Sequence, residues 1–353
     1  MSTVPVRFVV REVALYERPV ELRLPFRFGV ITLTACPQAF ARVVIEIASG
    51  APSSRAQGGS AELMVPKWFD KRAQLSQAQN IDQLRFAAHA AGTVLHSALE
   101  PATAFDFSIR MTDAVRARAN QYDIPPLASG FGPALLERAL IDALCRALGC
   151  SFFEAARKNL LGVDRRAVAE TNINAGGIER FCMTLQARER IGARHTVGLL
   201  DPISDAEATS APNDGLPVSL AGAIRRYGHR AFKLKVAGDL AADLARLRAI
   251  ARVLDELPEH WLASLDGNEQ FEDVEPVVEL LAKMREDAAL ARLYERIAYI
   301  EQPLARARAL DVSVAPIDRH KPVIIDESDA DETSFVTARA RGYRGVSSKT
   351  CKG

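Results

Sequence analysis

The sequence lacks paired cysteines, long apolar runs and an excess of charge of either sign. Its five cysteines are an odd number and include no C-x-x-C pair, which excludes a zinc site or redox disulfide of the usual close spacing. No run approaches the roughly 18 charge-free residues that a membrane helix needs, and residues 1–11 contain no stretch of signal-peptide character. We therefore expect a cytoplasmic protein with reduced thiols.

The charges of the chain nearly cancel, since 45 lysines and arginines face 44 aspartates and glutamates. Without a global field of one sign, we expect neither nucleic acid nor a membrane as partner. The pair Gly176 and Gly177 is not followed by the pattern of a dinucleotide or phosphate loop, so no nucleotide cofactor is expected. What is present, 48% apolar and 25% charged residues in 353, is typical of a folded protein with two domains, or with one large barrel and an appendage.

The first 150 residues predict an α+β domain. Residues 13–16, 20–24 and 41–48 alternate like strands of an antiparallel meander, and the Gly, Ser, Pro and Ala content of residues 50–59 indicates a turn or a mobile loop. In residues 81–99 and 133–148 the apolar spacing changes to three and four, which is typical of amphipathic helices.

After residue 194 the pattern changes to short apolar runs separated by long helical segments, as in parallel β-α units. A doubly wound sheet and a closed barrel both fit this pattern. The predicted strands are residues 195–200, 231–236, 261–266, 297–301, 322–326 and 345–349.

Three successive predicted strands each end in a carboxylate: Asp266, Glu301 and Asp326. The C-terminal strand ends of a β/α barrel converge on one mouth, where active sites lie. Three carboxylates at one mouth repel each other and would not all stay ionised without a cation between them. Hard oxygen ligands at three points suit Mg²⁺ or Mn²⁺.

Lysines accompany the three carboxylates. Strand alternation places Lys233 and Lys235 on one face, opposite an apolar face that meets the helices, and Lys349 comes at the end of the sixth predicted strand. A lysine that is desolvated near other cations has a lowered pKa and can act as a base near neutral pH.

The order Lys-x-Lys at 233–235, Asp-x-Asn at 266–268, Glu-Gln-Pro at 301–303, Asp-Glu-Ser at 326–328 and a later lysine resembles the enolase superfamily, in particular its muconate-lactonizing-enzyme-like and mandelate-racemase-like branch. The resemblance covers most of the chain. It implies an α+β capping domain at residues 1–165, followed by a (β/α) TIM-type barrel at residues 166–353.

The resemblance also implies roles for individual residues. Asp266, Glu301 and Asp326 would bind the metal, with Asn268 beside them. Lys235 and Lys349 would act as base and acid on opposite faces of the substrate, and Lys233 would help to lower the pKa of Lys235. Residues 25–29 look like the mobile substrate loop of the family, which makes candidate substrate contacts of three residues: Phe26, Arg27 and Phe28.

The implied chemistry is removal of the α-proton of a small carboxylate substrate, with Mg²⁺ binding the carboxylate and stabilising an enediolate. Racemisation, epimerisation, cycloisomerisation and dehydration all share this first step. We also expect a homo-oligomer. The alternative is a catalytically silent or truncated homologue that acts as a binding or structural protein.

Several points stay open. A (β/α)₈ barrel needs about 250 residues, whereas 353 − 194 = 159 follow residue 194 and hold six predicted strands, so the barrel is expected to be cut after the sixth strand. A fragment, a truncated product or misplaced strands would each explain this. Residues 167–174 are an alternative first strand, and Lys352 is an alternative to Lys349. Residues 66–71, with one of the two tryptophans, form either a second loop over the pocket or an aromatic anchor in the core of the small domain.

Overall fold

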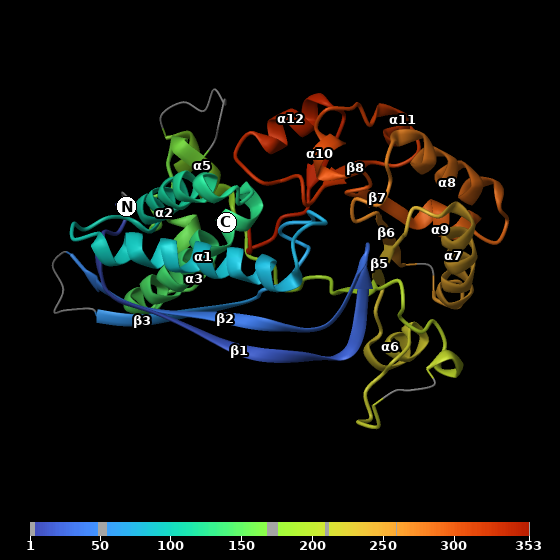
Figure 1. The fold of residues 1–353 in the computed structure, drawn as a ribbon, viewed down its shortest axis with the longest axis horizontal. Helices are drawn as coiled ribbons and strands as arrows, with labels where there is room; N and C mark the ends of the chain where they lie inside the picture. The colour runs from blue at the N-terminus through green and yellow to red at the C-terminus, as the bar shows by residue number, and fades with distance from the viewer. Residues whose placement is uncertain (1–3, 49–54, 168–175, 209–211, 259, 353) are drawn as a thin grey trace.

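The computed structural model describes residues 4–48, 55–167, 176–208, 212–258 and 260–352. An antiparallel sheet of three strands, covered by helices, forms the first part of the chain, and a parallel sheet of six strands forms the second (Figure 1). No helix within these ranges is both long enough and apolar enough to cross a bilayer.

The antiparallel sheet consists of β1 (Phe8–Phe28), β2 (Ile31–Ile47) and β3 (Arg55–Leu63), in that order. The two predicted strands at 13–16 and 20–24 are parts of the single strand β1. The prediction of a loop at residues 25–29 is wrong for residues 25–28, because pairing with β2 resumes at Phe26↔Leu33 after a register shift and continues to Phe28↔Ile31. The turn falls at Gly29, whose φ of 52° suits glycine.

The prediction of a turn or mobile loop at residues 50–59 is wrong for residues 55–59, which begin β3; residues 50–54 lie outside the described ranges. Gly58 explains the difference. A Cβ atom there would lie 2.2 Å from the Ala139 carbonyl oxygen, so the helix that crosses β3 needs a glycine beneath it. The glycine content that indicates a loop instead permits a close approach of helix and strand.

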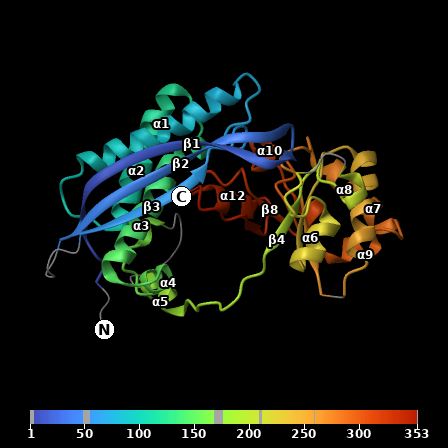
Figure 2. The same cartoon turned by 90° about the horizontal axis from the view of Figure 1, so that it is seen from below.

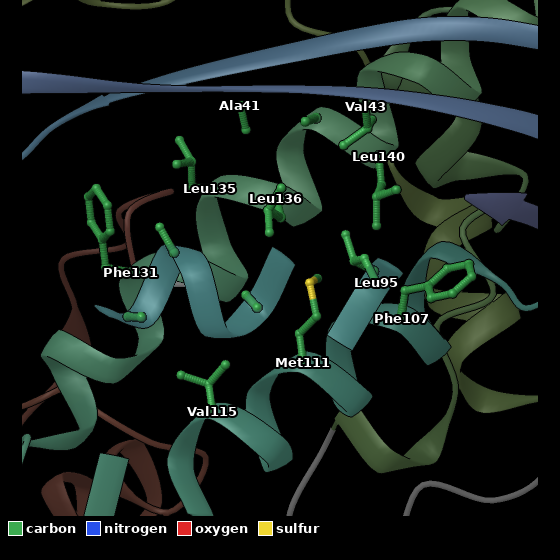
Figure 3. Close-up of a cluster of buried hydrophobic side chains, with 14 of the residues drawn as sticks. Ala41, Val43, Leu95, Phe107, Met111, Val115, Phe131, Leu135, Leu136 and Leu140 are labelled. Atoms are coloured by element: carbon green, nitrogen blue, oxygen red, sulfur yellow. The ribbon is translucent and has the colours of Figure 1, made fainter. Parts of the chain in front are cut away.

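Two helices cover this sheet, α1 (Gln77–Ser97) and α3 (Pro126–Leu148), and a third, α2 (Ala104–Ala119), packs against both of them. The predicted helices at 81–99 and 133–148 correspond to α1 and α3, whereas α2 is not anticipated. Leu136 and Leu140 of α3, Met111 of α2 and Val43 of β2 meet in the core (Figure 3), all of them fully buried. Burial of each such side chain contributes about 1.5–3 kcal/mol. Two shorter helices follow, α4 (Phe152–Arg157) and α5 (Gly177–Thr184).

The six parallel strands follow one another in chain order, as they do in a TIM-type barrel, whereas a doubly wound sheet reverses its order. Within the described ranges no strand pairs with the outer edge of the first or the last of them. Most of the alternative first strand, residues 167–174, lies outside those ranges. The strands are β4 (Arg194–Val197), β5 (Ala231–Lys235), β6 (Leu262–Asp266), β7 (Ile297–Glu301), β8 (Val323–Ile325) and β9 (Gly345–Val346).

Helices of the second part share an apolar layer with the parallel sheet, and several of them gather on one side of β4 in Figure 2. Phe232 and Leu234 of β5 are fully buried in this apolar layer, which leaves Lys233 and Lys235 on the other face, as the alternation predicts. These helices are α6 (Leu220–Tyr227), α7 (Leu240–Leu254), α8 (Val274–Glu286), α9 (Ala291–Arg296), α10 (Arg306–Ala309), α11 (Ala315–Asp318) and α12 (Ser334–Ala340).

Candidate active site

Three carboxylates lie at the C-terminal ends of three neighbouring parallel strands. Asp266 ends β6, Glu301 ends β7, and Asp326 directly follows β8. Asp266 and Glu301 are paired in register, and all three residues are at most 1% exposed. The burial of three acidic groups at one edge of a sheet is costly unless cations neutralise them.

Two lysines of β5 supply part of that neutralisation. The Lys233 Nζ lies 2.6 Å from Oδ2 of Asp266 and 2.8 Å from Oε1 of Glu301. The Lys235 Nζ lies 2.7 Å from the same Oδ2 of Asp266. Both lysines are 7% exposed, so these ion pairs are buried. Lys233 therefore bridges two neighbouring carboxylates, while Lys235 pairs with only one of them.

The charges of this cluster shift the two lysine pKa values in opposite directions. Burial lowers the pKa of Lys235, and the charge of Lys233 lowers it further, against the opposing charge of Asp266. Burial would also lower the pKa of Lys233, but Asp266 and Glu301 outweigh it and raise the pKa. For Asp266, burial raises the pKa but the two lysines outweigh it, so the carboxylate stays ionised. Lys235 is therefore the lysine that gives up its proton more easily.

A second pair of lysines contacts Asp326. Since β9 is only two residues long, Lys349 lies beyond the strand and not at its end, yet it forms an ion pair with Oδ2 of Asp326 and lies 4.0 Å from Oε1 of Glu301. Lys352 lies 3.2 Å from Oδ1 of Asp326 and donates to the carbonyl oxygens of Asp326 and Ser347. The Lys352 ammonium is thus held by fixed acceptors, whereas the Lys349 side chain is 31% exposed.

Asn268 joins the lysine–carboxylate cluster to a further acidic residue, Glu327. Its Oδ1 accepts a hydrogen bond from Lys235, and its Nδ2 donates to Oε1 of Glu327 over 3.0 Å. Glu327 is fully buried, and burial, with the nearby charges of Asp326 and Asp266, raises its pKa to about 7. Glu327 is not among the site residues predicted from the sequence. The sequence feature that could have identified it is a second acidic residue directly after a strand end.

Gln302 also escapes selection by sequence, although it fixes the strand ends. Its Oε1 accepts hydrogen bonds from the backbone N–H groups of Asp326 and Ser328, at 2.7 and 3.1 Å, and its Nε2 donates to Oγ of Ser328 over 2.7 Å. This fully buried amide ties the end of β7 to the end of β8. It therefore holds the backbone of Asp326 in place beside Glu301.

Aromatic rings from the first part of the chain approach two of the lysines. The Phe28 ring centroid lies 5.9 Å from the Lys235 Nζ, and the Trp68 ring centroid lies 4.7 Å from the Lys349 Nζ, which are cation–π distances. Phe26 packs beside Phe28, with ring centroids 5.7 Å apart. Arg27 is not brought into this group, because strand alternation turns its exposed side chain to the other face of β1.

The three carboxylates have the chemistry of a Mg²⁺ site. Within the described ranges, however, no three His, Cys, Asp or Glu side chains are placed to share one ion, because lysine ammonium groups lie between the carboxylates. Oε2 of Glu301 accepts no hydrogen bond from the described residues despite its burial. Oε1 of Glu301 and Oδ1 of Asp326 instead lie 2.8 and 3.2 Å from the ammonium groups of Lys233 and Lys352. A buried carboxylate oxygen without such a bond is the kind of ligand that a hard cation prefers, so the three carboxylates fit Mg²⁺ or Mn²⁺.

A cavity of about 930 Å³ reaches Lys349 from the side of α3. Lys349 and its neighbours Ser348 and Thr350 form one wall, and Arg138 and Arg146 of α3 contribute to the other. A second cavity, of about 1030 Å³, lies at the N-terminal ends of the parallel strands, with Ala231 and Ile297 in its lining, and is therefore remote from the carboxylates. The first cavity borders Lys349, and a third cavity, of about 330 Å³, borders Lys352, so both could give a small anion access to a lysine that contacts Asp326.

Comparisons with known proteins identify the fold. No protein-family model and no curated protein sequence matches the chain. Among solved structures, a Bradyrhizobium enolase complexed with magnesium and mandelic acid is 18% identical with a TM-score of 0.62, over 98% of this chain and 75% of that one. An Enterococcus faecalis dipeptide epimerase complexed with Mg and L-Leu-L-Tyr is 14% identical with a TM-score of 0.60, over the same shares. A Bacillus cereus N-succinyl Arg/Lys racemase is 16% identical with a TM-score of 0.62, over 98% and 73%.

The chain has the fold of the enolase superfamily. The resemblance that the sequence motifs indicate is thus confirmed at the level of the fold, which solved proteins described as mandelate racemase/muconate lactonizing enzyme-like also have. About a quarter of the length of each neighbour has no counterpart in this chain. Identities of 14 to 18% establish the enolase-superfamily fold without assigning a reaction.

Proposed function

We propose that the chain removes the α-proton of a small carboxylate substrate with the help of Mg²⁺ or Mn²⁺, as the first step of a racemisation, epimerisation, cycloisomerisation or dehydration. The observation that carries this proposal is the meeting of three buried carboxylates with lysines from two directions. Lys233 and Lys235 approach from β5, and Lys349 approaches from the segment after β9. Magnesium in the solved neighbours of the same fold supports the choice of metal.

In this proposal Asp266, Glu301 and Asp326 hold the metal, which would stabilise negative charge on the substrate as a Lewis acid. Lys235 takes up or returns a proton at its Nζ, for which its lowered pKa suits it. Lys349 contacts the opposite end of the row of carboxylates and would serve as its counterpart. The two lysines would then act on the substrate from two sides.

A second candidate function is binding without catalysis, by a silent or truncated homologue in the cytoplasm. The observation that favours it is that Lys233 and Lys349 already pair with the three carboxylates, so the cluster is neutralised without a metal. The unpaired outer edges of β4 and β9, within the described ranges, also leave room for a further partner strand or a second copy of the chain.

Solvent deuterium exchange separates the two candidates. Wild-type protein with Mg²⁺ is incubated in D₂O with dipeptides, N-acyl amino acids, muconate-like acids and sugar acids, and α-deuteration is measured by mass spectrometry. We expect exchange with at least one class, its abolition in Lys235→Ala, and weaker Mg²⁺ binding by calorimetry in Asp266→Asn. Lys283→Ala, on the exposed face of α8, is the matched control. Mg²⁺ binding without exchange in any class would favour the second candidate, and unchanged exchange in Lys235→Ala would contradict the assignment of the base.

A further inference from the structure

A second buried ion cluster joins the two parts of the chain outside the lysine–carboxylate site. At its centre is Glu269, in the loop after β6, whose side chain is 3% exposed. Arg306, the first residue of α10, donates from Nε to Oε1 and from Nη2 to Oε2, each over 2.8 Å, and its backbone N–H donates to Oε1 over 2.8 Å. The Lys71 Nζ lies 2.8 Å from Oε2. The four donors around this carboxylate thus all belong to Arg306 and Lys71.

The contacts of this cluster cross between the parts in both directions. Arg306, from the parallel-sheet side, donates from Nη1 to the carbonyl oxygen of Phe69 over 2.9 Å and from Nη2 to that of Trp68 over 2.8 Å. Lys71, from the antiparallel-sheet side, donates to the carbonyl oxygen of Asn268. Because a guanidinium group is planar and rigid, bonds to a carboxylate and two carbonyl groups fix their relative positions.

The segment that Arg306 holds carries the aromatic ring over Lys349. Trp68 packs edge-on against Phe69, with ring centroids 4.7 Å apart, and Phe69 packs edge-on against Phe131 of α3 at 5.4 Å. The Trp68 ring also contacts the Lys349 ammonium, which lies 4.7 Å from the ring centroid. Lys349 lies beyond β9 and therefore lacks the strand pairing that orients Lys233 and Lys235.

The backbone of the loop after β6 needs this cluster as well. Asn268 and Glu269 have φ angles of 41° and 67°, in the left-handed region that non-glycine residues rarely adopt. Such a conformation persists where surrounding contacts determine it. The four donors on the Glu269 carboxylate provide those contacts, and Asn268 in turn accepts a hydrogen bond from Lys235.

We propose that Glu269, Arg306 and Lys71 form a positioning unit that sets the Trp68 ring over Lys349 and so fixes the place of that ammonium beside Asp326. This rests on the proposed function, in which Lys349 is one of the two proton-transferring lysines. The three residues do not touch the lysine ammonium themselves; they act through Trp68.

A competing explanation is that the segment holds its shape without this unit. The backbone N–H of Lys67 donates to Oδ1 of Asn80 over 2.8 Å, and its Nζ donates to the carbonyl oxygen of Arg72 over 2.6 Å. The first bond attaches the segment to α1, and the second closes the segment on itself, so both lie within its own domain. They leave its placement against the parallel sheet to Arg306 and Lys71.

The first test observes Trp68 without reference to activity. The chain has two tryptophans, so protein labelled with 5-fluorotryptophan gives two ¹⁹F resonances, which Trp68→Phe assigns. We expect Arg306→Gln to shift the Trp68 resonance and leave that of the buried Trp261 unchanged. Arg308→Gln is the matched control, since Arg308 lies on the same helix but pairs with Asp273 at the surface. An unchanged Trp68 resonance in a folded Arg306→Gln protein would overturn the proposal.

Should Arg306→Gln fail to fold, as judged by circular dichroism, Arg306→Lys and Lys71→Met are measured instead. Arg306→Lys keeps the positive charge but loses the planar fork, and Lys71→Met keeps the bidentate pair of Glu269 and Arg306. Both are expected to shift the Trp68 resonance, and an unchanged resonance in both would overturn the proposal in the same way.

The second test measures deuterium exchange with whichever substrate class the chain accepts. Arg306→Gln should lower kcat by up to about 100-fold, as for a displaced reacting group, with a smaller change in KM. A shifted Trp68 resonance with unchanged kcat would overturn the effect on Lys349. If wild-type protein exchanges no substrate while the resonance shifts as expected, the proposed function fails and the structural role of the unit stands.

Discussion

Replacement of Lys233 by methionine tests most directly whether this lysine neutralises the buried carboxylates of the site. Methionine has a similar length and removes only the charge. In wild-type protein the Lys233 ammonium is the closest cation to Glu301, at 2.8 Å, whereas Arg194 and Lys349 lie at 3.8 and 4.0 Å. Lys233→Met therefore leaves Glu301, which is fully buried, without a close partner.

The expected cost follows from the two short contacts that Lys233 makes. At 2.6 and 2.8 Å and an effective dielectric constant near 20, each contact contributes about 6 kcal/mol of Coulomb energy. Much of this is offset by the desolvation of the ammonium, and removal of one partner of a buried ion pair typically costs about 3–5 kcal/mol. We expect Lys233→Met to lower the free energy of unfolding by that amount in the presence of EDTA.

The measurement is urea unfolding followed by circular dichroism, with EDTA and with saturating Mg²⁺. A cation bound by the three carboxylates would replace the lost positive charge. Mg²⁺ at about 100 times its Kd should therefore raise the free energy of unfolding of the variant by about 2.7 kcal/mol. Lys283→Met is the control, because that exposed lysine makes only an i,i+3 pair and should cost less than about 0.5 kcal/mol. A free energy of unfolding of Lys233→Met that does not rise with Mg²⁺, or a loss in EDTA no larger than in the control, would refute the reasoning.

Three further predictions concern stability and use the same unfolding assay. Leu136→Ala, in the core of the helical layer, should cost about 2–5 kcal/mol, and a cost below 1 kcal/mol would contradict the packing described. Gly132→Ala should lower the free energy of unfolding, because its Cβ would lie 2.1 Å from the Ala87 carbonyl oxygen. Gly92→Ala, whose Cβ would have nothing nearer than 3.7 Å, should raise it by about 0.5–1 kcal/mol. Equal effects of the two substitutions would be inconsistent with the close contact at Gly132. Burial raises the pKa of Asp70, but hydrogen bonds from Arg72 outweigh it and lower the pKa. Asp70→Asn should therefore cost about 1–3 kcal/mol at pH 7. This difference should persist above the ordinary aspartate pKa of about 3.9 and be lost as pH falls through the lowered pKa of the folded protein, and a pH-independent cost would count against the ion pair.

The parallel sheet is the part of the fold that the sequence predicts best. The runs that contain β5, β6 and β7 are short, apolar and ended by a charge, so both the strand and the position of its functional residue can be read together. The same alternation that buries Phe232 and Leu234 places Lys233 and Lys235 beside Asp266.

The antiparallel sheet is predicted less well, because its local composition misleads. β3 contains two adjacent glycines, and their role becomes visible only when the close approach of α3 at Gly58 is known. Residues 25–28 resemble a loop in composition, yet pairing with β2 outweighs local preference.

Contacts between the two parts of the chain could not be predicted from spacing at all. Arg306 and the carbonyl oxygen of Trp68 are 238 residues apart, and no periodicity relates residues so distant. Lys352 is visible in the sequence as a lysine near Lys349, but its fixed bonds to Asp326 and Ser347 depend on how the chain turns after β9.

The long hairpin of β1 and β2 limits the kinds of sequence change that the site tolerates. Phe28, which contacts Lys235, lies at the far end of this hairpin and is paired with Ile31 of β2. Side chains on a strand alternate between two faces. Insertion of a single residue between Phe28 and the turn at Gly29 would turn Phe28 to the other face of the strand, so its ring would no longer lie above the Lys235 ammonium. Variation in this segment during evolution is therefore expected to proceed by substitution and not by changes in length, in contrast to surface loops that accept insertions freely.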